Sequence, residues 1–226
     1  MRGYWRAVAA LVEKDLRLEW RSREAITSMA FFSVLVVVIF GFAFQTRKID
    51  PATEAPGLLW VAFSFSGILG LHRVLAIERE NAALQALLLA PVDRSAIFLA
   101  KMISVLGLVL LAEWITIPIF SILLRVPVLS CLPELALVTC AGSVGFAAVG
   151  VLLATISSGS RLREVLLPLL LYPLWVPILV GCVELTGLAL SGRPLAEGSD
   201  WLVLLAAYDV VFVTAGTLLF DLMLEE

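Results

Sequence analysis

Long apolar runs separated by short charged segments dominate the pattern of this chain. Six runs reach the roughly 20 residues, at about 1.5 Å rise per residue, that a helix needs to cross a hydrocarbon core about 30 Å thick. They comprise residues 25–44, 57–77, 96–124, 132–156, 165–190 and 201–222. Because backbone polar groups inside a bilayer must be satisfied within the segment, each run predicts a helix. The expected fold is an all-α polytopic membrane protein.

Residues 1–24 show a different pattern, in which apolar side chains recur at helical spacing on one face and charged side chains occupy the others. The apolar face consists of Trp5, Ala9, Val12, Leu16 and Trp20. This pattern predicts an amphipathic helix that lies flat at the membrane surface. The alternative is a continuation of the first membrane-spanning helix.

The composition agrees with a membrane environment. Hydrophobic residues make up 61% of the 226 residues and charged residues 15%, and the mean hydropathy is +1.03, which is far from the usage of a soluble domain. With a net charge of −3, the chain offers no broad cationic face, which argues against nucleic-acid binding. The segments between the spans are short and show no repeat, so we expect a single domain over residues 1–226.

The positions of lysine and arginine predict the orientation, because positive residues near helix ends stay on the cytoplasmic side. With the amino terminus inside, 12 of the 16 lysines and arginines fall on the cytoplasmic side, half of them in residues 1–24. The other four are Arg47, Lys48, Arg125 and Arg193. We therefore expect both termini in the cytoplasm.

The sequence contains no motif for ATP hydrolysis. A phosphate-binding loop needs a Gly-Lys pair followed by Ser or Thr, whereas Lys14, Lys48 and Lys101 follow Glu, Arg and Ala. No Ser and His or paired Asp constellation is placed for another reaction. We expect a non-catalytic subunit that uses ATP only through a partner.

A segment before the third span predicts a docking helix. Residues 77–90 favour a helix that is too short and too charged at its start to span, and Pro91 ends it. Its leucines share one face, which an amphipathic helix can lay into a groove on a partner. The alternative is a short surface helix that rests on lipid. The candidate coupling residues are Arg79, Glu80, Leu84, Gln85, Leu87, Leu88 and Pro91.

Several stretches resemble one protein family. They are residues 55–62, 79–91, 97–101, 145–150 and 165–168, with Pro173 and Pro177. In this order they resemble the heme exporter B proteins of the cytochrome c maturation system, which are permeases of the ABC class. The resemblance covers nearly the whole chain, with matching length and six spans. The chain departs from the family at His72, where an acidic residue is common, and at Leu84-Gln85, where the family has Leu-Glu after a Gly.

This resemblance implies an ABC-2-like permease in the bacterial inner membrane. It also implies partners: a second copy of the chain, two copies of a separate ATPase subunit, a heme-handling membrane subunit and a small accessory subunit. ATP hydrolysis by the partner would drive heme delivery to a periplasmic heme chaperone during c-type cytochrome biogenesis. The resemblance leaves open whether heme passes through this subunit.

Heme is expected as cargo rather than as a stably bound cofactor. Its iron takes axial ligands such as His, Met or Cys, and the single histidine, His72, is predicted near the cytoplasmic end of the second span. Cys131, Cys140 and Cys182 lack the Cys-x-x-Cys spacing of a metal or redox site. We interpret them as buried small side chains.

Three carboxyl groups fall within predicted spans: Glu113, Glu184 and Asp209. A charge in hydrocarbon is costly, so each is expected to face protein or water, or to be protonated. Two roles are open. In a structural role they hydrogen-bond across helices or to a partner; in a functional role they line an outward cavity or contact the heme-handling subunit.

Pro168, Pro173 and Pro177 fall within one predicted span. Each removes a helix hydrogen bond, so we expect this helix to be broken or bent near the outer face.

Two other functions fit parts of the pattern. An ABC-2-type permease for lipid, polysaccharide or drug export would have similar spans and a similar docking segment. A proton-driven secondary carrier would use Glu113, Glu184 and Asp209 as a relay, but such carriers often pair two broken helices in inverted repeats, and only one span here carries helix breakers. The resemblance at residues 56–62 favours the heme exporter interpretation.

Overall fold

Helices account for nearly all of the computed structural model, which describes residues 2–47, 51–80, 93–157 and 163–223. They are α1 (Arg2–Ser22), α2 (Glu24–Arg47), α3 (Pro51–Glu80), α5 (Arg94–Leu124), α6 (Leu132–Ser157), α7 (Arg163–Leu190) and α8 (Ser199–Met223). Short 3-10 turns at Val128–Cys131 and Leu195–Gly198 precede α6 and α8. None of the described residues forms a β-strand, so the all-α prediction is confirmed.

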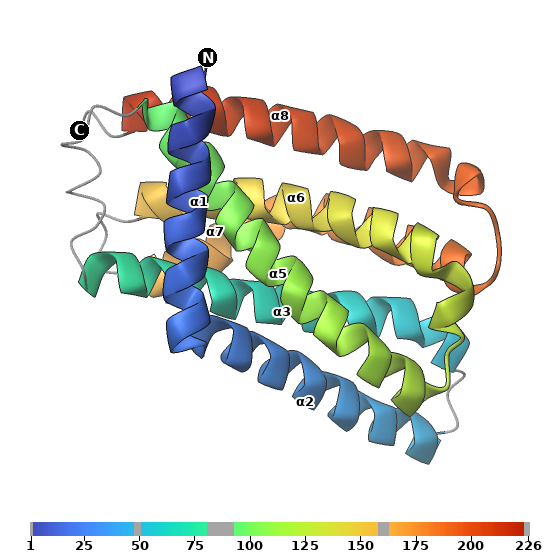
Figure 1. Ribbon diagram of the computed structural model, residues 1–226. Coiled ribbons are helices and arrows are strands. Elements are labelled where there is room, and N and C mark those ends of the chain that lie inside the picture. Colours follow the sequence, from blue (N-terminus) through green and yellow to red (C-terminus); the bar gives the residue numbers. More distant parts are fainter. Residues whose placement is uncertain (1, 48–50, 81–92, 158–162, 224–226) are drawn as a thin grey trace.

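Six of these helices, α2, α3 and α5 to α8, are long and apolar enough to cross a membrane. Each corresponds to one predicted span. The largest difference is at α3, which begins at Pro51 and continues to Glu80, beyond both predicted ends. In Figure 1 the six helices run along the bundle, α5 obliquely, whereas α1 runs across one end of it.

A sharp corner separates α1 from α2. Arg23 adopts a left-handed conformation with φ of 55°, and its amide donates to the Glu19 carbonyl at 2.6 Å. The Glu19 carboxylate reaches into the next helix, where its Oε1 accepts a hydrogen bond from the Ile26 amide at 2.9 Å. A carboxylate at this position satisfies an amide of the first turn of α2 and complements the helix dipole. The predicted amphipathic helix is therefore a separate helix and not a continuation of the first span.

The connections divide between the two ends of the bundle. Figure 1 shows α1 and the carboxyl end of α8 at one end, and both 3-10 turns at the other. This division follows from six consecutive crossings. As a result, Arg6 and Arg94 lie at the α1 end, whereas Arg125 and Arg193 lie at the opposite end.

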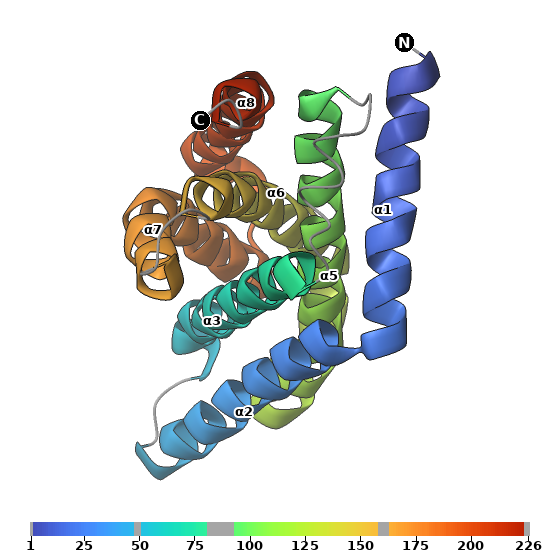
Figure 2. The same cartoon turned by 90° about the vertical axis from the view of Figure 1, so that its left-hand side faces the viewer.

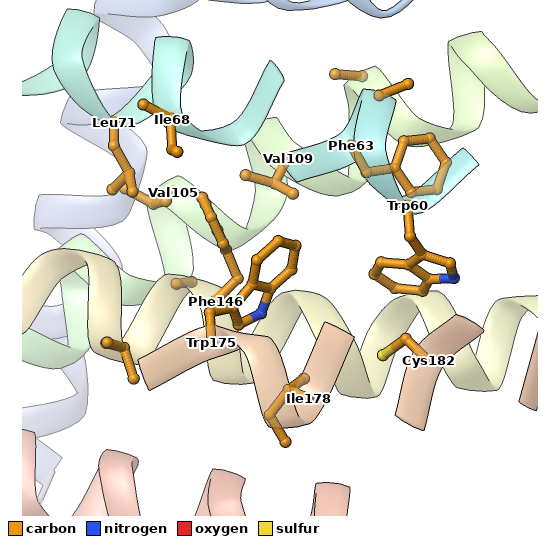
Figure 3. Close-up of a cluster of buried hydrophobic side chains, with 14 of the residues drawn as sticks. Trp60, Phe63, Ile68, Leu71, Val105, Val109, Phe146, Trp175, Ile178 and Cys182 are labelled. Carbon is orange, nitrogen blue, oxygen red and sulfur yellow. The ribbon is translucent and has the colours of Figure 1, made fainter. Parts of the chain in front are cut away.

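An aromatic-rich core joins α3, α6 and α7. The Phe146 and Trp175 ring centroids lie 5.0 Å apart, and the Trp60 ring lies 6.4 Å from Trp175, as Figure 3 shows with the aliphatic residues around them. The Trp60 Nε1 donates to Thr186 Oγ1 at 2.9 Å, which satisfies the buried indole. Because lipid tails are as apolar as the helices, close packing and such hydrogen bonds hold the bundle together.

α7 is one continuous helix although it contains Pro168, Pro173 and Pro177. The predicted break is therefore absent. Each proline removes one amide donor, and the bonds on either side continue the helix. Prolines are tolerated in membrane helices because neighbouring groups and local adjustments satisfy the freed carbonyls.

Candidate functional site

α5 is the helix that follows the predicted docking segment along the chain. Its first turn is capped by Asp93, whose side chain accepts a hydrogen bond from the Ser95 amide at 3.1 Å. Arg79 and Glu80 close α3. The remaining candidate coupling residues lie outside the described residues: Leu84, Gln85, Leu87, Leu88 and Pro91. The docking helix therefore stays a prediction.

α5 is central to the packing of the bundle. It contacts α3 and α6, which adjoin it in the sequence, and also α1, α2 and α8. Figure 2 shows α1 beside α5, with α7 and α8 on the far side of the bundle. Polar side chains on α5 add specific bonds to three of these helices.

Lys101 ties α5 to α1. Its Nζ lies 2.8 Å from Asp15 Oδ2, and the two side chains are only 8% and 11% exposed. Lys14 lies 3.0 Å from the other Asp15 oxygen, and the Tyr4 hydroxyl lies 3.1 Å from Ser95 Oγ. Removing one partner of a buried ion pair leaves an uncompensated charge, so these contacts hold α1 in one position on α5.

Sequence reasoning missed the Lys101–Asp15 pair. Lys101 lies inside the predicted third span, and a cation within a span calls for a partner. Asp15, however, is one of several charged residues in residues 1–24, and nothing in the helical spacing distinguishes it from Glu13 or Glu19. The pair becomes visible only when α1 is placed across α5.

Thr116 ties α5 to α2. Its hydroxyl lies 2.6 Å from Ser33 Oγ, and both residues are buried. Each hydroxyl also lies within hydrogen-bonding distance of a carbonyl of its own helix, Thr116 Oγ1 of Ala112 at 2.8 Å and Ser33 Oγ of Ala30 at 3.1 Å.

Glu113 ties α5 to α6. The Ser143 hydroxyl lies 2.8 and 2.9 Å from its two carboxylate oxygens, and the residues are 3% and 1% exposed. This is the helix-to-helix arrangement among the alternatives predicted for the carboxyl groups. The side chain faces protein on all sides, which meets the requirement for an acidic group within a span.

One turn of α6 brings further polar groups to this place. Gly142 and Gly145 leave room for neighbouring side chains, because a Cβ atom at either position would lie 2.7 Å from Cys182 Sγ or from Asp209 Oδ1. Ser143 lies between the two glycines. α6 therefore meets Glu113 of α5, Cys182 of α7 and Asp209 of α8 within residues 142–145.

The three predicted intramembrane acids do not share one environment. Glu113 is hydrogen-bonded, whereas Asp209 Oδ1 is buried and makes no hydrogen bond to another described residue. Glu184 is exposed on α7. The structure thus brings Glu113 and Asp209 to the same turn of α6 and leaves Glu184 on the surface of the isolated chain.

The remaining candidate ligands are dispersed. His72 is half-buried near the carboxyl end of α3. The three cysteines are not joined by disulfides; Cys131 and Cys182 are buried as expected, whereas the expectation was wrong for Cys140, which is exposed. Among the described residues, no three His, Cys, Asp or Glu side chains are grouped as a metal ion would require.

Comparison with known proteins decides the family. The model of the family described as CcmB protein matches residues 6–225, which is nearly the whole chain. The chain belongs to the CcmB family. It is 27% identical to heme exporter protein B of Pseudomonas aeruginosa over 202 residues, which cover 87% of this chain and 88% of that protein. It is 32% identical to heme exporter protein B of Rhodobacter capsulatus over 187 residues, or 78% and 80% of the two chains. The corresponding protein of Paracoccus denitrificans is 30% identical over 201 residues, or 88% and 89%.

Proposed function

We propose that this chain is the membrane permease subunit of an ABC-type complex that exports or delivers heme for c-type cytochrome biogenesis. The observation that carries the proposal is the CcmB match over residues 6–225, on a chain with six helices able to span a membrane. Heme is the cargo, and ATP hydrolysis belongs to a separate ATPase subunit. The chain itself acts as a non-catalytic subunit of the inner membrane.

In this function α5 transmits movement from the ATPase into the bundle. The docking segment, residues 79–91, ends two residues before the Asp93 cap of α5. A displacement of the segment would act on α3, which it continues, and on α5. From α5 it would reach α1 through Lys101, α2 through Thr116 and α6 through Glu113. Packed helices joined by such bonds move together in small shifts rather than deforming independently.

The heme-handling partner, rather than this subunit, holds the heme iron in the proposal. His72 could supply only one axial imidazole to the heme iron. Stable heme ligation also depends on the groups around the axial ligand. The partners are a second copy of this chain, two ATPase subunits, the heme-handling membrane subunit and a small accessory subunit. The periplasmic heme chaperone receives the cargo.

Affinity purification of the tagged chain from its own membranes tests the function. We expect an ATPase subunit and a heme-handling subunit in the purified complex, and loss of covalently heme-bearing c-type cytochromes when the gene is deleted. Recovery of glycan or lipid machinery instead, with normal cytochromes in the deletion strain, would assign the permease to another cargo.

Replacing Leu87 and Leu88 by Asp tests the docking segment in the same purification. Each leucine side chain that is no longer buried in an apolar groove of the partner removes about 1.5–3 kcal/mol of binding free energy. The yield of copurified ATPase subunit should therefore fall roughly tenfold or more. Ser158→Asp with Ser160→Asp, which adds the same charge to the connection between α6 and α7, is the matched control and should retain the ATPase. Equal yields for both double variants would remove residues 79–91 as the docking segment.

A further inference from the structure

A groove of about 820 Å³ runs along α1 next to α5. Its floor is apolar and includes Ala9, Val12 and Leu16 of α1 and Ile103 of α5. Trp5 and Trp20, which also line it, are 59% and 71% exposed. Exposed tryptophans of this kind are typical of the membrane–water interface, where one edge of the ring is apolar and the other is polar.

The groove opens onto a lipid-facing strip of α5. Ile103 lines the groove, and Gly107, Leu111 and Trp114 follow it at spacings of three or four residues, all exposed. Residues at this spacing share one side of a helix. An extended hydrocarbon chain that lies in the groove along α1 can therefore continue along α5 toward the middle of the bundle.

The charges beside the groove are predominantly positive once the internal contacts of α1 are counted. Asp15 is paired with Lys101 and Lys14, and Glu13 with Arg17.

Glu19 is buried at the α2 corner, where it accepts the Ile26 amide. Arg21 lines the groove and is exposed, and no described residue forms an ion pair with it. Of the charged residues that line the groove, Glu13 and Arg17 pair with each other, which leaves the cation of Arg21 at the rim.

We propose that this groove binds one anionic phospholipid, with an acyl chain on the apolar floor and the phosphate group at Arg21. Basic residues near a membrane surface attract anionic headgroups, and an apolar helix face holds the acyl boundary. The lipid covers the apolar side of α1 that packing within the chain leaves exposed. The proposal concerns a structural ligand and does not depend on the identity of the cargo.

Native mass spectrometry of the full-length chain, titrated with dioleoyl phosphatidylglycerol or dioleoyl phosphatidylcholine, tests the headgroup. One basic residue near a surface contributes about 1 kcal/mol, so Arg21→Gln should weaken the first phosphatidylglycerol bound about fivefold and leave phosphatidylcholine unchanged. Arg6→Gln removes the same charge from α1 at an exposed position that does not line the groove. It should retain wild-type affinity. Equal losses in both variants would overturn the site in favour of diffuse attraction to α1.

A second pair of variants tests the acyl chain. Ala9→Phe places a ring on the groove floor and should weaken the first bound molecule of both lipids, whereas Ala10→Phe, at an exposed neighbouring position outside the groove, should not. Unchanged lipid binding by Ala9→Phe would overturn the proposal. So would loss of self-association or of copurified ATPase without loss of lipid, because the groove would then be a protein interface. Melting temperatures of all four variants verify folding.

Discussion

At the scale of single residues, the sequence predicted where polar groups are anomalous but not how they are satisfied. Glu113 stands out because an acidic side chain within a span must meet protein or water. Its partner, Ser143, lies 30 residues away and is one of many hydroxyls in the chain. Its selection depends on the rotation of α6 against α5, which apolar runs do not specify. For Asp209, likewise, the sequence predicted its depth but not its place beside Gly145.

The Glu113–Ser143 bond can be tested by a double-mutant cycle. Ser143→Ala should lower stability by about 1–3 kcal/mol, because it leaves a buried carboxyl group without its partner. Glu113→Gln should cost less, since an amide can still exchange a hydrogen bond with Ser143. Thermal unfolding of the purified chain in detergent measures both.

The cycle is closed by Glu113→Leu, made alone and in combination with Ser143→Ala. If the two side chains interact, the cost of the double variant should be smaller than the sum of the single variants. Strict additivity would show that the contact carries no coupling energy.

At the scale of helices, length and hydropathy predicted every span, and the pattern of residues 1–24 predicted a separate amphipathic helix. For α7 the expected break was wrong, because the hydrogen bonds that remain around Pro168, Pro173 and Pro177 continue the helix; the expected bend stays a prediction. The position of α1 across α5 was not predictable, since Asp15 and Lys101 belong to segments that show no mutual pattern.

The Lys101–Asp15 pair should control how firmly α1 is held. Asp15→Asn removes the carboxylate that lies 2.8 Å from Lys101 Nζ, and Lys101→Met removes the buried cation; breaking a buried ion pair in this way costs about 3–5 kcal/mol. Hydrogen exchange in residues 2–22 should accelerate by about tenfold or more, with little change in α6 or α8. Hydrogen–deuterium exchange followed by mass spectrometry measures the difference.

Two variants serve as controls for this pair. Lys14→Met removes the more exposed partner of Asp15 and should cost about 1 kcal/mol or less. The Asp15→Asn, Lys101→Met double variant removes both buried charges and should protect α1 better than either single variant. If the effects of the two single variants on the hydrogen-exchange rate of residues 2–22 simply added in the double variant, the ion pair would not be what holds α1.

At the scale of the whole molecule, the fold class followed from the sequence because six apolar runs leave little choice of secondary structure in a bilayer. The order in which helices pack did not follow. Contacts such as Trp60 with Thr186 join α3 to α7 across 126 residues, and they depend on side-chain shape that hydropathy averages away. The docking residues 79–91 were identified from the sequence and stay a prediction.

The arrangement of the two bundle ends predicts a labelling pattern. In a variant with Cys131, Cys140 and Cys182 replaced by Ala, a cysteine at the exposed positions Ser130 or Ser191 should react with a membrane-impermeant maleimide in cells with a permeabilised outer membrane. A cysteine at Ser22 should react only after the inner membrane is opened, because the excess of basic residues at the α1 end favours the cytoplasm. The opposite pattern would invert the proposed orientation.

The buried ion pair also sets an order of events during synthesis. Asp15 and Lys101 are separated by 86 residues, so α1 leaves the ribosome long before its partner does. Until the third span enters the membrane, α1 can rest on the bilayer surface, but Asp15 cannot yet form its ion pair with Lys101 of α5. The two segments that precede α5 must therefore insert around an undocked α1, and the arrival of Lys101 closes the assembly of the first half of the chain.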